Sequence, residues 1–188
     1  MTMRITKVYT RAGDDGATRL GGGQKVEKSA VRIRTYGTVD ELNSAIGLVV
    51  AHNPCEEVGR ALNRIQHELF TLGGDLCVLE EDKATFKMQV IEKEQVRSLE
   101  KTLDTLNAQL KPLEDFILPG GTKTSAFLHQ ARCVCRRAES LAVQLASEES
   151  LGKQVVPYLN RLSDALFVMA RFENFSSGRA DIYWQKNA

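Results

Sequence analysis

The residues best suited to chemistry are arginines that repeat at helical spacing late in the chain. Polar side chains follow one another at spacings of three, four and three residues, namely His129, Arg132, Arg136 and Glu139, with Arg137 beside them. In a helix these spaced positions share one edge. A solvated face with ion pairs has similar spacing. Three arginines within six residues, with few acids to balance them, favour a site for phosphate or carboxylate, which the guanidinium fork binds bidentately.

A glycine-rich segment near the N-terminus is the second candidate for anion binding. Residues 10–28 hold five glycines together with Arg11, Arg19, Lys25 and Lys28. They show neither helical nor alternating apolar spacing, so we predict a loop. Its glycines would let backbone NH groups approach an anion closely. A terminal arm without a ligand is the alternative. Neither a Walker A pattern nor a calcium-binding loop is present in the sequence.

Several familiar catalytic patterns are missing from the sequence. It contains no GxSxG or HExxH motif, and its four cysteines form no CxxC pair, so we expect reduced thiols. His52 and His67 have no metal-ligand partner at helical spacing. An anion site without a protein nucleophile fits a reaction whose nucleophile belongs to a bound cofactor.

Composition narrows the class of protein. The chain has 188 residues, of which 43% are hydrophobic, and this fits one globular domain. With 25 Lys and Arg against 24 Asp and Glu, the net charge of +1 offers no broad basic field, so we expect no nucleic-acid partner. No apolar run approaches the ~20 residues of a membrane span, and the start lacks a secretory leader. We therefore expect a cytoplasmic protein without membrane association.

Five apolar stripes with spacings of three and four residues predict the elements that position these side chains. The stripes cover about 38–52, 58–76, 96–110, 127–145 and 155–169. Thr38 and Glu41 form a capping-box pattern that predicts the start of the first helix. The last helix carries a polar row of Asn160, Asp164 and Arg171. No strand pattern longer than a few residues competes, so we predict an all-α five-helix bundle with a glycine-rich N-terminal loop.

Five segments in order resemble PduO-type ATP:cob(I)alamin adenosyltransferases. They are YTRAGDDGATRL (9–20), YGTVDELNSAIG (36–47), FILPGG (116–121), HQARCVCRRAE (129–139) and YLNRLSDALFVMAR (158–171). The resemblance covers nearly the whole chain. It implies one cobalamin adenosyltransferase domain over residues 1–188. This domain would consist of an N-terminal nucleotide-binding segment (1–35), a helical bundle (36–175) and a C-terminal tail (176–188).

The resemblance also implies an activity and an assembly. Family members transfer the 5′-deoxyadenosyl group of ATP to the cobalt of cob(I)alamin and release triphosphate. Mg²⁺ assists, and we expect it to bind through the ATP phosphates. Members are homotrimers of five-helix bundles with active sites between subunits. Expected partners are a corrinoid reductase and an adenosylcobalamin-dependent enzyme. A non-catalytic bundle that binds nucleotide or delivers adenosylcobalamin is the alternative, whereas a ferritin-like metal bundle would need Glu-x-x-His pairs, which are missing.

The resemblance assigns roles to individual residues. Arg132, Arg136 and Asp40 are expected in the catalytic centre, with Asp40 pairing to Arg132 across the subunit boundary. Phe116 is expected to pack beneath the corrin ring and help displace its lower axial base, and Asp164 is expected near cobalamin. The implied ATP contacts are Thr10, Arg11, Gly13, Asp14, Gly16, Thr18, Arg19, Lys28, Arg136, Arg137, Glu139 and Asn160.

Overall fold

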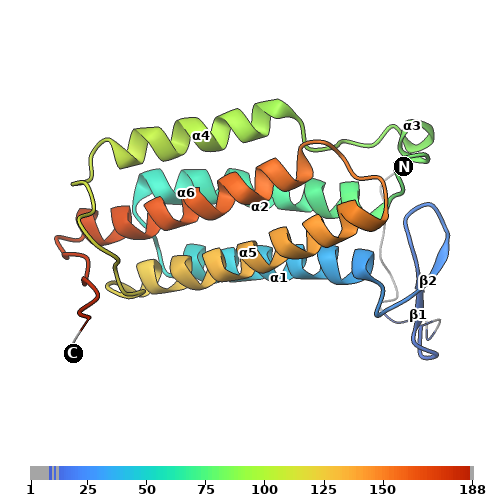
Figure 1. Cartoon of the computed structure of the whole chain (residues 1–188), viewed down its shortest axis with the longest axis horizontal. Helices are drawn as coiled ribbons and strands as arrows, with labels where there is room; N and C mark the ends of the chain where they lie inside the picture. The colour runs from blue at the N-terminus through green and yellow to red at the C-terminus, as the bar shows by residue number, and fades with distance from the viewer. Residues whose placement is uncertain (1–8, 10, 12, 187–188) are drawn as a thin grey trace.

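A computed structural model describes residues 9, 11 and 13–186. This part of the chain forms two strands and six helices: β1 (Ala17–Arg19), β2 (Lys25–Glu27), α1 (Val31–Ala51), α2 (Glu56–Cys77), α3 (Lys83–Phe86), α4 (Lys93–Asn107), α5 (Lys123–Glu148) and α6 (Val155–Ser176). The five long helices lie side by side as a bundle (Figure 1). The mostly helical architecture is therefore confirmed. The count of five helices is wrong, because the four-residue α3 lies between α2 and α4.

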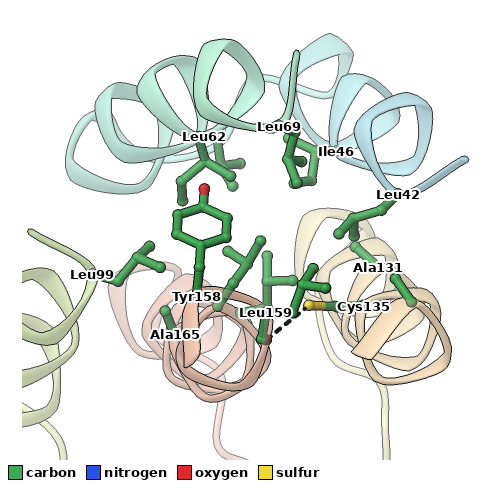
Figure 2. Packing of buried hydrophobic residues seen from close by; sticks show 14 of the residues in the cluster. Leu42, Ile46, Leu62, Leu69, Leu99, Ala131, Cys135, Tyr158, Leu159 and Ala165 are labelled. Carbon is green, nitrogen blue, oxygen red and sulfur yellow. Dashed lines mark hydrogen bonds between the residues drawn. The ribbon is translucent and has the colours of Figure 1, made fainter. Parts of the chain in front are cut away.

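The core lies where the apolar faces of the helices meet (Figure 2). Leu42 of α1, Leu62 of α2 and Leu159 of α6 are fully buried. Burying one such side chain contributes about 1.5–3 kcal/mol. The thiol of Cys135 lies 3.2 Å from the Leu159 carbonyl oxygen, and burial raises its pKa. Among the described helices, none combines the length and apolar character needed to cross a membrane.

The first long helix begins seven residues earlier than the capping-box pattern predicts. α1 starts at Val31, and the hydroxyl of Thr38 donates to the Arg34 carbonyl oxygen inside the helix. The predicted cap is therefore wrong. The early turns are stabilised instead by Arg32, whose buried guanidinium donates to the Leu76 carbonyl oxygen (2.8 Å) and to Glu149 (2.9 Å). Because Arg32 is charged, it adds nothing to the apolar spacing from which helices are predicted, so that spacing does not reveal the first turns of α1.

The glycine-rich segment contains a short antiparallel hairpin. β1 pairs with β2 so that Ala17 faces Glu27 and Arg19 faces Lys25. The predicted loop is therefore wrong for these residues, since three-residue strands are too short to show an alternating pattern. Gly23 has a φ of 94°, which L-residues rarely adopt, and it lies between the strands. The hairpin lies at one end of the bundle, beside the start of α1 (Figure 1).

Candidate active site

A cavity of about 1160 Å³ opens between α4, α5, α6 and the segment at 113–117. It exceeds the ~300–1,000 Å³ usual for drug-sized ligands. It is lined by Arg132 and Arg136 of α5, by Asp164 and Phe167 of α6, and by Phe116 of the segment at 113–117. The structure therefore brings together four predicted site residues, from three separate stretches of the sequence. Phe167 is an additional lining residue that the sequence reasoning treated only as part of a matching segment.

The two cavity arginines differ in their surroundings. The Cζ atom of Arg132 lies 5.9 Å from the centroid of the Phe167 ring, within range of a cation–π interaction. The Nε atom of Arg132 is buried and has no hydrogen-bond partner among the described residues. Arg136 is exposed, and the described residues give it no hydrogen bond or ion pair. Its planar donor fork is thus available to an anion at the cavity.

His129 differs from the arginines with which it shares helical spacing because its side chain is buried. Its side chain is buried, with the ring centroid 6.0 Å from that of Phe167, and both ring nitrogens lack hydrogen-bond partners among the described residues. Burial lowers the pKa of His129, and the positive charge of Arg132 lowers it further. The ring is therefore neutral near pH 7 and packs behind the cavity lining.

The other polar residues of α5 and α6 form separate pairs. Arg137 makes an ion pair with Glu41 of α1. The side-chain amide of Asn160 donates to Glu139 across a distance of 2.9 Å. Thus Glu139 and Asn160, predicted to serve the same nucleotide, lie in contact.

The third member of the predicted polar row on the last helix, Arg171, does not line the cavity. Asp164 lines the cavity and lies 3.5 Å from a guanidinium nitrogen of Arg161. The side chain of Arg171 is only 7% exposed and pairs with Asp181 at 2.9 Å. Arg171 shares the helical face of Asn160 and Asp164, but its side chain is bound to Asp181 near the end of α6 and does not line the cavity.

The hairpin gathers most of the predicted N-terminal nucleotide contacts. Lys28 donates to the Gly13 carbonyl oxygen across 2.6 Å, and Arg19 donates to the Gly23 carbonyl oxygen across 2.8 Å. Thr10 lies outside the described residues. The others in or beside the hairpin are Arg11, Asp14, Gly16 and Thr18.

Sequence reasoning missed one participant in the hairpin, Asp15. Its carboxylate accepts from the backbone NH of Ala17 (3.2 Å) and pairs with Lys25 (3.2 Å). The NH of Ala17 and then Lys25 lower the pKa of Asp15. Asp15 thereby holds the turn that leads into β1.

One chain does not bring the hairpin and the arginine row together. The hairpin leads into α1, where Arg32 is bound to Glu149 at the end of α5. Arg136 precedes Glu149 by thirteen residues of helix, or about 20 Å at 1.5 Å per residue. The segment that carries Phe116 lies at the opposite end of the bundle from the hairpin (Figure 1). Asp40 is exposed and has no hydrogen bond or ion pair within the described residues.

Comparison with known proteins shows the family to which the chain belongs. Residues 8–173 match the family model described as cobalamin adenosyltransferase. The chain belongs to this family. It is 44% identical to the cobalamin adenosyltransferase of Cupriavidus metallidurans over 99% of this chain and 98% of the relative. It is also 44% identical to the corrinoid adenosyltransferase of Bacillus subtilis, over 97% of this chain and 94% of the relative.

Solved structures show the same architecture. A variant PduO-type ATP:corrinoid adenosyltransferase from Lactobacillus reuteri, complexed with cobalamin and ATP, superposes with a TM-score of 0.90. It is 36% identical, over 96% of this chain and 100% of that chain. Another variant from that organism, complexed with ATP, has a TM-score of 0.86 and 33% identity over 95% and 100%. The predicted PduO-type resemblance is confirmed.

Proposed function

We propose that this chain transfers the 5′-deoxyadenosyl group of ATP to the cobalt of cob(I)alamin and releases triphosphate. Membership of the cobalamin adenosyltransferase family is the observation that carries the proposal. The cobalt(I) electron pair forms the new bond to the ribose 5′ carbon, while the bond from that carbon to the triphosphate oxygen breaks. The protein then needs no nucleophile of its own. Its task is to hold two substrates in line and to stabilise the leaving group.

The arginine row and the hairpin would bind the nucleotide. Arg136 lines the cavity and makes no hydrogen bond or ion pair with the described residues, and Lys28 supplies an exposed ammonium at the hairpin. Both charges suit the triphosphate, on which negative charge builds as it leaves. Mg²⁺ would bind through the phosphates. No group of three or more His, Cys, Asp or Glu among the described residues is arranged to hold a metal. The remaining proposed ATP contacts are Thr10, Arg11, Gly13, Asp14, Gly16, Thr18, Arg19, Arg137, Glu139 and Asn160.

The aromatic part of the cavity lining would receive the corrinoid. Phe116 is 76% exposed and lines the cavity, so its ring can contact a planar ligand there. Phe167 adds a second aromatic ring, and Asp164 adds a carboxylate. An apolar wall at the lower face would exclude the axial base and water, which favours the base-off form of cobalamin and eases reduction of its cobalt.

We further propose a homotrimer with active sites between subunits. Within one chain Arg32, which follows the hairpin, is bound to Glu149, and Glu149 lies about 20 Å along α5 from Arg136, so we infer that a second copy supplies the hairpin to each cavity. The exposed carboxylate of Asp40 would pair with Arg132 of a neighbouring copy. Sedimentation gives the number of copies.

Co-expression of two inactive variants tests whether the site is shared. If Lys28→Ala and Arg136→Ala subunits mix at random, about a quarter of intersubunit sites contain neither change, and activity returns. A site built within one chain would regain no activity in the mixture.

The activity itself has a direct assay. We expect the protein, incubated with ATP, Mg²⁺ and chemically reduced cobalamin, to produce the absorption spectrum of a light-sensitive alkylcobalamin, and no such spectrum without ATP. Binding of ATP and adenosylcobalamin without product formation would support the non-catalytic delivery role instead. The reaction consumes ATP and a reduced corrinoid, so we infer a cytoplasmic setting with a corrinoid reductase upstream and an adenosylcobalamin-dependent enzyme downstream.

A further inference from the structure

Two side chains of α6 hold both ends of the segment that carries Phe116. Arg171 donates to the Lys111 carbonyl oxygen at 2.8 Å, near the beginning of that segment. Asn174 accepts from the Thr122 backbone NH at 3.0 Å and donates to the Gly120 carbonyl oxygen at 3.3 Å, at the end of the segment. Residues three apart on a helix share a face. The segment is therefore anchored at both ends to one turn of α6.

A single carboxylate joins these two anchors. Asp181 pairs with Arg171 at 2.9 Å and accepts from the Asn174 side-chain amide at 3.3 Å. The side chains of Arg171 and Asp181 are only 7% and 13% exposed. Removing one partner of a buried ion pair leaves the other charge uncompensated. Asp181 thus fixes the C-terminal segment to the same turn of α6 that holds residues 111–122.

Beyond Asp181 the C-terminal segment pairs directly with the Phe116 segment. The Leu118 NH donates to the Ile182 carbonyl oxygen at 2.7 Å, and the Trp184 NH donates to the Phe116 carbonyl oxygen at 2.8 Å. The Phe116 side chain itself is 76% exposed, so little packing holds it in place. Its position at the cavity therefore depends on its backbone. That backbone is bound by the C-terminal segment.

We propose that Asp181 is a positioning residue for Phe116. Through Arg171 and Asn174 it locks the C-terminal segment against residues 116–118, and this contact holds the Phe116 ring at the cavity. The inference rests on the proposed function, because it assigns Asp181 an effect on the corrinoid step. It requires no contact between Asp181 and either substrate.

The substitution Asp181→Asn tests this role, and the fluorescence of Trp184 reports on the C-terminal segment. Trp184, the only tryptophan of the chain, lies in the C-terminal segment. We expect lower Trp184 fluorescence anisotropy, loss of the base-off cob(II)alamin spectrum, and kcat/KM for the corrinoid reduced about tenfold with an unchanged KM for ATP. Asp181→Glu, which restores the carboxylate, should recover part of each signal.

Glu68→Gln is the matched control. Glu68 is a poorly exposed carboxylate on α2 that accepts from the Tyr158 hydroxyl at 2.9 Å and pairs with Arg64 at 3.2 Å. It does not line the cavity. Its loss should lower the melting temperature while leaving the Trp184 anisotropy and the base-off spectrum at wild-type values. Equal changes in both variants would mean that Asp181 only stabilises the fold, and would overturn the proposal.

A second variant disturbs the contact between Asn174 and the end of the Phe116 segment without changing Asp181. Gly121 has a φ of 101°, and a Cβ atom there would collide with the Asn174 side chain. Gly121→Ala should therefore reproduce the loss of base-off spectrum with Asp181 intact.

Combining Asp181→Asn with Phe116→Ala decides whether the effect passes through Phe116. If it does, the double variant is no slower than Phe116→Ala alone, whereas multiplied losses overturn the proposal. Unchanged Trp184 anisotropy in Asp181→Asn overturns it as well. That readout needs no corrinoid, so it tests the lock even if the wild-type chain fails to transfer adenosyl groups, a result that would refute only the proposed function.

Discussion

Replacing Arg136 by alanine separates catalysis from folding. The Arg136 side chain is exposed and has no hydrogen bond or ion pair within the described residues. Its removal should change the free energy of unfolding by less than about 0.5 kcal/mol, as for other surface substitutions. The melting curve of Arg136→Ala should therefore overlay that of the wild type. Any loss of activity then arises at the site.

The expected loss of activity follows from the charge on the leaving triphosphate. One preorganised contact to a developing anion contributes ~3 kcal/mol to transition-state stabilisation, and this corresponds to about a hundredfold in rate. Arg136→Lys keeps the positive charge and loses the planar fork, so its rate should lie between those of wild type and Arg136→Ala.

The assay is the initial rate of alkylcobalamin formation at saturating reduced cobalamin and varied ATP. Arg60→Ala is the matched control, because the Arg60 side chain is 71% exposed on α2 and its one ion pair with a described residue is a surface pair with Glu56 at 3.6 Å. We expect wild-type turnover in the control. Wild-type turnover in Arg136→Ala would remove Arg136 from the mechanism, and a large drop in its melting temperature would show that Arg136 has a structural role.

Three further predictions test the cavity, the assembly and the buried histidine. Phe116→Ala should bind ATP with unchanged affinity while the base-off cob(II)alamin spectrum disappears; an unchanged spectrum would count against its role. Asp40→Arg and Arg132→Asp should each lose activity, and the double reversal should restore part of it, whereas a double variant no better than the singles would disprove the pairing. Burial lowers the pKa of His129, and the positive charge of Arg132 lowers it further. The negative charge of Asp181 raises this pKa by a smaller amount. As the pH falls through about 6.5 the unfolded chain therefore binds the proton first and stability decreases. In thermal melts at about pH 7.5 and pH 5.5, His129→Gln should lose less stability than wild type; equal losses would contradict this origin.

The long helices could be predicted because their core faces are apolar at regular spacing. The stripe from Val58 to Leu76 identifies α2 to within two residues at its start and one at its end. The cavity arginines could also be predicted, since their spacing and their type both point to one helix edge. In both cases the side chains whose spacing predicts the feature are the same side chains that form the core or line the cavity.

Contacts between distant polar residues could not be predicted in this way. Arg32 stabilises the first turns of α1 by hydrogen bonds to the Leu76 carbonyl oxygen and the Glu149 carboxylate. These partners lie 44 and 117 residues away in the sequence. Arg171 has the spacing of an exposed row and instead binds Asp181. A single sequence gives no signal for such pairs, because each partner by itself looks like an ordinary surface residue. For this reason the sequence did not predict the contacts of Arg171, Asn174 and Asp181 that hold the Phe116 segment.

α6 connects the cavity to the C-terminal lock. Asp164 and Phe167 line the cavity, while Arg171 and Asn174 lie farther along the same helix and hold the Phe116 segment. Ten residues of helix, from Asp164 to Asn174, set a separation of about 15 Å along the axis. Because packing of its apolar face holds α6 in the core, the position of Phe116 at the cavity depends on the turn of α6 to which its segment is bound. A change at Asp181 should therefore move Phe116 while Arg132 and Arg136 stay in place.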